Sequence, residues 1–359
     1  MVLTTEQDTA VRSCVGLLTE QHFEPGHRVF RLGGYAGTGK TTCAEYIVDA
    51  VQYPIPCAYC GKAAARMIEK GVSGATTIHR AIYTYDMKRK RFFKKDEVLG
   101  EYFLIDEGSM VGSKIWADIL SFRKPVIIIG DPGQLQPVGD DDPHLMRDCD
   151  YVLQEPHRQA LKSGIIQYAT DIRKGFETQE AYPDVEIRRT RRGHRPTDDD
   201  IVGNDIMLCG WNNTRVDLNI RYRNIMGLKG LISEGERIIV LRNDYSHNVF
   251  NGQMFTVLHA DPIGSDVHMV ECVDALGVHH SFSVGNAQFN AQKGPKWTNG
   301  ASTVFADYAY CTTTHKAQGS EWDNVLVVDE DGGDLWDQTR WRYTAVTRAA
   351  KKLTMLGRV

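Results

Sequence analysis

Residues 31–43 read Arg31-Leu32-Gly33-Gly34-Tyr35-Ala36-Gly37-Thr38-Gly39-Lys40-Thr41-Thr42-Cys43, which contains the complete pattern Gly-x-x-x-x-Gly-Lys-Thr of a phosphate-binding loop. The apolar run at residues 29–32 predicts a strand before the loop, and the apolar spacing that follows Thr42 predicts a helix after it. A loop between a strand and a helix is the context that phosphate binding requires. The alternative, a glycine turn with a chance lysine, does not explain these flanks.

The residue types of this loop match the chemistry of a bound triphosphate. Glycines let successive backbone N–H groups turn toward the phosphates, and the helix N-terminus adds positive potential. Lys40 is expected to reach the β and γ oxygens, and the Thr41 hydroxyl is expected to bind Mg²⁺. We therefore predict nucleotide contacts from Gly34, Ala36, Gly37, Thr38, Gly39, Lys40, Thr41 and Thr42.

Length and composition describe an ordinary globular protein of two domains. The chain has 359 residues, with 42% hydrophobic and 25% charged residues. It has no apolar run of about 18 residues, and its first residues lack the basic and then apolar pattern of a signal peptide. These features predict a cytoplasmic protein without a membrane partner, located in the host cytoplasm if the gene belongs to a phage.

Charge and cysteine content support neither a nucleic-acid-binding protein that is basic overall nor a zinc site with four ligands. The net charge of −4 gives no global basic signature, so any nucleic-acid contact must come from a local surface. Among the eight cysteines only Cys57 and Cys60 form a close pair, and a zinc site with four ligands would need a second pair. Reduced structural thiols are the favoured interpretation.

A helix is predicted before the phosphate loop, and Gln7 in it has two interpretations. The stretch Thr4-Thr5-Glu6-Gln7 matches a capping box, in which Gln7 caps the helix. Its amide could instead bind the adenine edge, because an amide both donates and accepts hydrogen bonds. The local sequence favours the cap.

Two further strands are predicted to end in polar residues suited to nucleotide hydrolysis. The apolar strand at residues 101–105 is followed by Asp106, expected to hold Mg²⁺, and by Glu107, expected to orient and deprotonate a water molecule. The strand at residues 125–129 leads to Gln134, whose amide could sense the γ-phosphate. Repeated strand, loop and helix units predict an α/β fold with a parallel sheet, whose first domain closes near residue 150.

Three features of the first domain suit a nucleic acid. Lys62 follows Gly61 at a predicted helix start, where a backbone phosphate could bind. His79 by itself is best explained as a structural histidine. Residues 83–98 predict a projecting hairpin, in which Phe92 and Phe93 lie among six cations and could stack on a base. A charged surface ribbon with both phenylalanines packed beneath it is the alternative.

The second domain is predicted to span residues 151–359. Its tract at residues 188–196 is rich in arginine and balanced by aspartates, which predicts a solvated loop. From about 230 to 300, short β-like runs separated by Asn, Asp and Gly turns predict a small inserted β-barrel. Strands of parallel-sheet type resume at residues 309–313 and 325–328.

An ordered set of motifs extends over nearly the whole chain, from residue 7 to residue 349. It consists of residues 34–41, residues 61–66, Thr77-Ile78-His79, Asp106-Glu107, residues 130–135, His157-Arg158-Gln159, residues 315–319 and residues 343–348. The set resembles superfamily-one DNA helicases of the B type, in the RecD and Dda group. The short chain, without an additional N-terminal domain, is similar to the phage Dda form.

The resemblance implies two RecA-like domains, with ATP between them and single-stranded DNA across their top. It implies that Gln7 binds adenine and that Glu321 approaches the ribose. It also implies that Arg158 and Arg348 are arginine fingers, and that Gln318 and Gly319 couple the nucleotide to the domain interface. It also implies that Lys62, His79, Thr313 and His315 line the DNA path, that the hairpin around Phe92 and Phe93 is a strand-separating pin, and that the barrel braces this pin. The sequence departs from the family pattern at Tyr59-Cys60, where such helicases usually carry Pro-Thr. The threonine hydroxyl that would contact a DNA phosphate is replaced there by a thiol, which is a weak hydrogen-bond donor.

The implied activity is an ATP- and Mg²⁺-dependent 5′-to-3′ helicase that translocates on single-stranded DNA and unwinds duplex. The expected partners are single-stranded DNA, junctions between single and double strands, and proteins of replication or recombination, with the chain itself acting as a monomer. One alternative is a nucleotide-switched translocase that displaces proteins from nucleic acid without productive unwinding. A member of the same superfamily directed to RNA is another.

Overall fold

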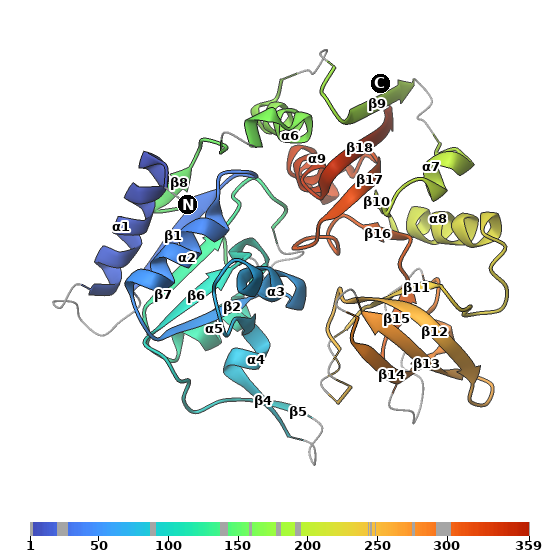
Figure 1. The fold of residues 1–359 in the computed structure, drawn as a ribbon, viewed down its shortest axis with the longest axis horizontal. Coiled ribbons are helices and arrows are strands. Elements are labelled where there is room, and N and C mark those ends of the chain that lie inside the picture. Colours follow the sequence, from blue (N-terminus) through green and yellow to red (C-terminus); the bar gives the residue numbers. More distant parts are fainter. Residues whose placement is uncertain are drawn as a thin grey trace. The chain divides into compact units, whose positions relative to one another are not determined.

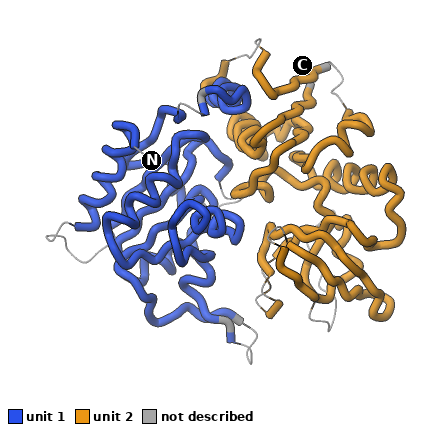
Figure 2. The backbone as a smooth tube through the Cα atoms, in the orientation of Figure 1, with its two compact units in different colours: residues 1–173 blue, residues 174–359 orange. Residues whose placement is uncertain are grey.

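The apolar run before the phosphate loop forms strand β1 (Val29–Gly34), and helix α2 (Lys40–Ala50) follows the loop. Both predicted elements are confirmed, and the helix begins at Lys40 rather than at Thr42. The computed structural model divides into two compact units, Met1–Arg173 and Lys174–Val359 (Figure 2). It describes residues 3–19, 28–86, 91–136, 143–157, 160–176, 181–190, 195–242, 244, 246–247, 249–274, 277–291 and 303–358.

Strand β1 belongs to a six-stranded sheet in the first unit, with the order β3-β2-β6-β7-β1-β8 (Figure 1). The other strands are β2 (Pro54–Ala58), β3 (Thr76–Thr77), β6 (Tyr102–Asp106), β7 (Val126–Gly130) and β8 (Tyr151–Leu153). Every neighbouring pair runs parallel. All residues of β6 and β7 are buried, because a parallel sheet is covered on both faces. The predicted α/β class is confirmed.

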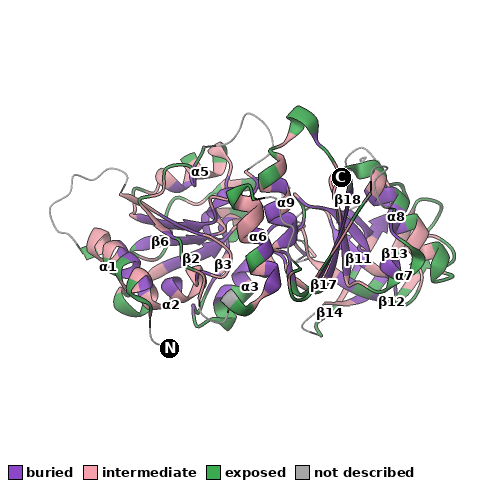
Figure 3. Ribbon diagram, turned by 90° about the horizontal axis from the view of Figure 1, so that it is seen from above, coloured by how far each residue is buried: buried purple, intermediate pink, exposed green. Residues whose placement is uncertain are grey.

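Helices lie on both faces of this sheet, and the strands between them are largely buried (Figure 3). The covering helices are α1 (Thr5–Thr19), α2, α3 (Gly61–Glu69), α4 (Ile78–Ile82) and α5 (Ser113–Leu120). The other helical segments described in this part of the chain are α6 (Gly164–Lys174) and the 3-10 turns η1 (Gly108–Met110) and η2 (Ala160–Lys162). In β7, Ile127 and Ile129 share a core with α1, α2 and α3, whereas Val126 and Ile128 share the other core with α4 and α5. Because strand side chains alternate between faces, one apolar run supplies both cores.

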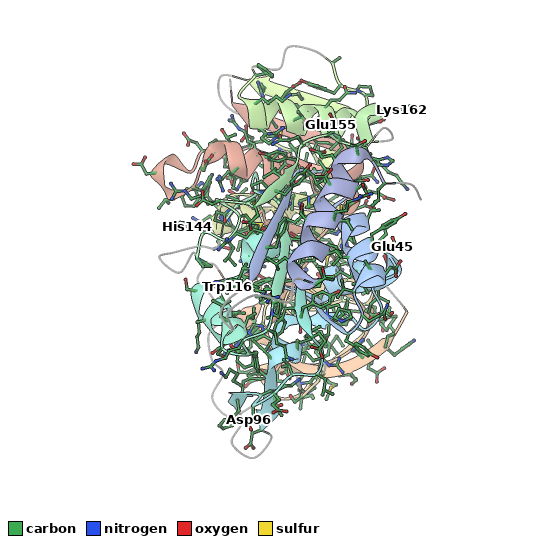
Figure 4. The ribbon with its side chains drawn as sticks, turned by 90° about the vertical axis from the view of Figure 1, so that its left-hand side faces the viewer. Glu45, Asp96, Trp116, His144, Glu155 and Lys162 are labelled. Carbon is green, nitrogen blue, oxygen red and sulfur yellow. The ribbon has the colours of Figure 1, made fainter. Side chains whose placement is uncertain are left out.

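A two-stranded antiparallel ribbon, β4 (Tyr83–Asp86) and β5 (Arg91–Lys94), lies in the region where the sequence predicts a hairpin. Its turn, residues 87–90, lies outside the described residues. Asp96, just after β5, lies at the opposite end of the first unit from Glu155 and Lys162 (Figure 4). The ribbon is therefore remote from the segment that follows β8.

The second unit contains a five-stranded parallel sheet with the order β16-β10-β17-β18-β9. Its strands are β9 (Val185–Thr190), β10 (Ile206–Cys209), β16 (Cys311–Thr313), β17 (Trp322–Val328) and β18 (Ala349–Arg358). Its helices and one 3-10 turn are α7 (Asp198–Val202), α8 (Asn212–Ile225), α9 (Gln338–Val346) and η4 (Gly333–Leu335). Across the described parts of both units, no helix combines the length and apolar character needed to cross a membrane.

The prediction of a solvated loop at residues 188–196 is wrong for its first three residues. Residues 188–190 belong to β9, which pairs with β18. The Arg188 guanidinium forms ion pairs with Glu186 at 2.7 Å and with Asp200 at 2.8 Å. Charge density alone suggested a loop, but carboxylates on the same strand and on α7 neutralise this arginine and allow the strand to form.

A five-stranded antiparallel sheet with the order β14-β13-β12-β11-β15 completes the second unit. It comprises β11 (Arg237–Val240), β12 (Met254–Pro262), β13 (Val267–Asp274), β14 (His279–Gly285) and β15 (Ala306–Tyr308), with the 3-10 turn η3 (Asn286–Gln288) after β14. Val304, just before β15, bridges to Val284 of β14, and its N–H donates to Ser283 O at 2.7 Å. The two edges of the sheet are thereby joined, and the sheet extends beyond the expected end near residue 300.

The antiparallel sheet and the parallel sheet of the second unit share one hydrophobic core. Phe255 and Phe282 from the former pack in the same cluster as Met207 and Leu326 from the latter. A buried ion pair between Arg215 and Asp307 links β15 of the antiparallel sheet to α8, the helix that packs beside the parallel sheet, with the two side chains 5% and 1% exposed. The inserted sheet is therefore a packed part of the second unit rather than an appended module.

The two compact units divide between Arg173 and Lys174, later than the expected boundary near residue 150. Strand β8 pairs with β1, and His157 N then donates to Gly37 O at 2.8 Å. A Cβ at Gly37 would lie 2.8 Å from the Ala160 Cβ. The segment after β8 thus packs on the phosphate loop, which a change in sequence pattern could not indicate.

Replacement of Arg215 tests the link between the two sheets. Arg215→Ala should lower the free energy of unfolding of the second unit by about 3–5 kcal/mol, because it leaves the Asp307 carboxylate buried without its partner. Chemical denaturation followed by circular dichroism measures this loss. The control is Arg221→Ala on the same helix, whose pair with Asp198 is largely exposed and contributes at most about 1 kcal/mol. Equal losses in the two variants would contradict the assigned role of the buried pair.

Candidate functional site

Glycines shape the phosphate loop between β1 and α2. Gly37 and Gly39 have φ angles of 76° and 83°, a left-handed conformation that side chains disfavour. A Cβ at Gly34 would lie 2.8 Å from both Lys40 Cγ and Thr38 Oγ1. Larger residues at these positions would push the loop away from its lysine. The loop therefore has the backbone cradle that a phosphate group fits.

The Lys40 ammonium is folded onto the loop that carries it. Its Nζ donates to Gly34 O at 2.7 Å and to Tyr35 O at 3.2 Å, and it lies 3.8 Å from Asp131 Oδ2. Asp131 is fully buried, and its Oδ1 accepts a hydrogen bond from Gly133 N. We did not single out Asp131 from the sequence. The signal that could have found it is its position directly after β7, the strand beside β1.

Gln7 contacts the phosphate loop and also caps α1. Its Oε1 accepts from Thr4 N at 3.0 Å, and its backbone N donates to Thr4 Oγ1 at 3.2 Å, so the predicted capping box is confirmed. Its Nε2 donates to Thr38 O at 2.9 Å. A Cβ at Gly39 would approach this nitrogen to 2.3 Å. The adenine contact of Gln7 stays a prediction.

The two predicted acidic residues lie at the carboxyl end of β6. Asp106 is buried, and its Oδ1 accepts a hydrogen bond from Glu107 N at 2.8 Å. Glu107 adopts a left-handed backbone conformation with φ 56°. Burial, and then repulsion by Glu107, raise the pKa of Asp106 to about 6, although the Lys40 ammonium opposes this shift. A carboxylate held in this way is suited to a cation that would compensate its charge.

Neighbouring strands bring the candidate catalytic groups to one edge of the sheet. The adjacent strands β6, β7 and β1 end at Asp106, Gly130 and Gly34, respectively. Gln134, which is buried, follows in the turn after β7, where its N donates to Asp131 O at 3.2 Å. Thr41 lies in the first turn of α2.

These residues fit Mg²⁺ held together with phosphates. Mg²⁺ in triphosphate sites takes one or two protein oxygen ligands and several from phosphate and water, which matches Thr41 and Asp106. Among the described residues, no group of three or more His, Cys, Asp or Glu side chains forms a metal site of its own. All eight cysteines are free thiols.

Arg348 is buried within the second unit, and Arg158 lies outside the described residues. The Arg348 guanidinium donates to Thr344 O at 3.0 Å, to Ser320 O at 3.1 Å and to Thr347 Oγ1 at 3.1 Å. These bonds use three of its N–H donors and leave two for another ligand. Through Ser320, the structure brings Arg348 against the loop that carries the predicted contacts Gln318, Gly319 and Glu321.

An aromatic row leads from α4 to the ribbon of the first unit. The His79 and Tyr83 rings are 5.4 Å apart, and the Tyr83 and Phe92 rings are 6.5 Å apart. Phe92 is 38% exposed and Phe93 is half-buried, so the alternative in which both pack beneath the ribbon is not what the structure shows. Burial lowers the pKa of His79, which favours a neutral ring. The sequence did not single out Tyr83 as the middle of this row.

The start of α3 carries the exposed Lys62, next to the residue pair that departs from the helicase pattern. Cys60 is the N-cap residue of α3. Burial raises the pKa of its thiol, so it remains protonated. The first turn of α3 therefore offers a cation and backbone N–H groups, but only a weak side-chain donor.

In the second unit, Thr313 ends β16 and His315 follows it. Thr313 is buried, and the half-buried His315 ring lies 6.2 Å from Trp336. Trp336 in turn packs 4.9 Å from Trp211 at the start of α8. Burial lowers the pKa of His315. The two tryptophans were not predicted, because nothing in the local sequence indicates that residues 125 positions apart meet.

Comparisons with known proteins match both parts of the chain. Residues 3–187 match the family model described as an AAA domain, and residues 308–356 match the UvrD-like helicase C-terminal domain. The ATP-dependent RecD2 DNA helicase of Deinococcus radiodurans is 27% identical over 368 residues, covering 92% of this chain and 47% of that protein. The chain spans less than half the length of the curated relatives it matches.

Solved structures agree with the fold. The Pif1 helicase from Bacteroides in complex with ADP-AlF3 and ssDNA has a TM-score of 0.58 at 17% identity, covering 99% of this chain and 92% of that one. The Pif1 helicase from Candida albicans has a TM-score of 0.58 at 16% identity, covering 99% and 94%. The chain therefore has the fold of these proteins. The narrower similarity to phage Dda stays a prediction.

The buried carboxyl group of Asp106 predicts a dependence of stability on pH in the protein without nucleotide or divalent cation. Because its pKa is raised to about 6, the folded chain binds more protons than the unfolded chain between about pH 4 and pH 6. The free energy of unfolding should fall through this range as pH rises. Asp106→Asn should remove the fall and stabilise the protein at neutral pH by on the order of 1–3 kcal/mol.

Denaturant titrations across this pH range measure the effect. Asp96→Asn serves as the control, because Asp96 is exposed and its replacement should leave the pH dependence of unfolding unchanged. If the free energy of unfolding of the wild-type protein stays constant between pH 4 and pH 6, the pKa of Asp106 is not raised by its burial.

Proposed function

The chain belongs to the family of the AAA domain, and from this premise we propose that it is an ATP-dependent DNA helicase of superfamily one, type B, of the RecD and Pif1 kind. The proposed enzyme translocates 5′ to 3′ on single-stranded DNA and unwinds duplex. The observation that carries this proposal is the common sheet edge shared by the phosphate loop, Asp106 and Asp131. That edge combines a phosphate cradle with carboxylates suited to hydrolysis.

Nucleotide binding draws Lys40 from the carbonyls of Gly34 and Tyr35 to the β and γ oxygens of ATP. The carbonyl bonds and the neighbouring Asp131 hold the ammonium near the loop until then. Thr41 and Asp106 would hold Mg²⁺, which supplies charge neutralisation on the phosphates when bound. Glu107 orients the attacking water and accepts its proton, while Gln134 senses the γ-phosphate.

Arg158 and Arg348 serve as arginine fingers in this proposal. Arg348 has two N–H donors beyond its three described bonds, so it can bind a phosphate without losing its support from Ser320 and Thr344. Loss of the γ-phosphate then removes the shared ligand of the two units. Alternate gain and loss of this link moves the chain along DNA only if each unit binds the strand with different affinity in the two states.

The proposed DNA path uses Lys62 and His79 in the first unit and Thr313 and His315 in the second. Phe92 and Phe93 act as the strand-separating pin, supported by the exposure of Phe92 and by the aromatic row behind it. Gln7 contacts adenine, Glu321 the ribose, and Gln318 with Gly319 the domain interface. The enzyme acts as a cytoplasmic monomer at junctions of single- and double-stranded DNA, in replication or recombination.

Two assays separate this proposal from its alternatives. Displacement of a labelled strand from a tailed duplex distinguishes a helicase from a translocase that only removes bound proteins. Comparison of ATPase stimulation by DNA and by RNA oligonucleotides distinguishes the DNA enzyme from an RNA-directed member of the superfamily. Strand displacement with the tail on either end tests the polarity.

Arg348→Ala tests whether the second unit contributes to hydrolysis. We expect nucleotide binding to persist and DNA-stimulated ATPase activity to fall by about 10³-fold or more, as for other arginine fingers. Lys40→Ala should abolish ATP hydrolysis and serves as the inactive reference. Arg340→Ala is the matched control, because that arginine lies on the neighbouring helix α9 and pairs locally with Asp337. DNA-stimulated turnover that survives in Arg348→Ala would refute a site built from both units.

The double variant Phe92→Ala with Phe93→Ala tests the pin. It should keep DNA-stimulated ATPase activity and lose strand displacement, because base stacking contributes about 1–3 kcal/mol per contact. The control is Phe176→Ala, which replaces an exposed phenylalanine just after α6. Unimpaired unwinding by the double variant would eliminate the pin from the proposal.

A further inference from the structure

The phosphate loop carries an aromatic side chain that a distant arginine covers. The Arg173 guanidinium lies over the Tyr35 ring, with its carbon 3.5 Å from the ring centre. Tyr35 follows Gly34 in the loop, and Arg173 lies in the last turn of α6. The contact spans 138 positions of sequence and joins the loop to a helix with no other predicted role.

The backbone of Tyr35 faces the lysine while its ring faces α6. Tyr35 O accepts hydrogen bonds from Lys40 Nζ at 3.2 Å, from Thr38 Oγ1 at 2.8 Å and from Thr38 N at 3.3 Å. The same residue therefore contacts both the group that must move to bind a phosphate and the helix that lies across the loop. A change at the Lys40 bond therefore occurs on the residue whose ring Arg173 covers.

Helix α6 rests on the loop at a second point and then leaves the first unit. A Cβ at Gly37 would lie 3.6 Å from Ile166 Cγ2, so the helix is in close contact with the loop backbone. The first unit ends at Arg173, and the chain enters the second unit at Lys174 (Figure 2). The residue stacked on the loop is thus the last one before the crossing between units.

We propose that the stack of Arg173 on Tyr35 is a nucleotide-responsive latch that couples the phosphate loop to the helix leading into the second unit. When a nucleotide draws Lys40 away from Tyr35 O, the loop rearranges at Tyr35 and the stack on Arg173 opens. The last turn of α6 then loosens. Arg173 is in this sense a positioning residue, and the latch rests on the nucleotide binding of the proposed function but not on DNA translocation.

The size of the effect follows from the chemistry of the contact. A guanidinium stacked on a tyrosine ring stabilises the closed arrangement by about fivefold, equivalent to about 1 kcal/mol. This is large enough to bias one helical turn and small enough for a bound triphosphate to reverse. A stronger contact would hold α6 closed in every state.

Hydrogen exchange of the full-length chain tests the latch, with a non-hydrolysable ATP analogue as the probe. In the wild-type chain, amides of residues 171–174 should exchange about fivefold faster when the analogue is added, while residues 33–42 gain protection. Arg173→Ala and Tyr35→Leu should show the fast exchange at residues 171–174 with and without analogue. Tyr35→Phe, which keeps the ring, should behave as wild type.

Two further comparisons make the outcome decisive. Lys162→Ala removes an exposed cation from the same segment and should leave the response intact. The double variant of Arg173→Ala and Tyr35→Leu should be no faster than either single variant, because both remove one contact. A response of wild-type size in either single variant would overturn the latch while leaving the nucleotide site standing. Absence of protection at residues 33–42 in the wild-type chain would overturn the proposed function together with the latch.

Discussion

The functional edge of the first unit depends on the charge balance around the Lys40 ammonium. Two loop carbonyls and the buried Asp131 carboxylate hold this ammonium, and it opposes the rise in the pKa of Asp106. A group held by several moderate contacts can change partners at modest cost when a better-matched anion arrives. The position of the Lys40 ammonium therefore affects the phosphate loop, the pKa of Asp106 and the proposed latch at Tyr35.

Parallel strand order is what concentrates these groups. Strands β6, β7 and β1 are neighbours, so polar residues placed after apolar runs far apart in sequence meet at one edge. Burial on both faces makes the strands rigid supports. In the second unit, the buried pair of Arg215 and Asp307 ties an inserted antiparallel sheet to the helix beside the parallel one. Both units thus use rigid sheets to position polar loops.

Local patterns predicted much of this fold. The strand and helix around the phosphate loop, the capping box at Thr4 and Gln7, and the α/β class were all indicated by spacing and residue type, and the structure agrees. The errors arose where tertiary contacts outweigh composition. Residues 188–190 form a strand because Glu186 and Asp200 neutralise Arg188, and the described residues after β8 join the first unit because His157, Ala160 and Ile166 lie against Gly37 of its phosphate loop.

The sequence alone determined the predicted phosphate loop, because a loop of eight positions must place its glycines, lysine and threonine at fixed spacing around one anion. Only the tertiary structure decided which side chains surround that loop. Asp131 beside Lys40, Arg173 over Tyr35 and Trp336 against His315 are contacts between separate elements. Their residue types occur widely in any chain, and only the order and packing of strands and helices brings these particular pairs together.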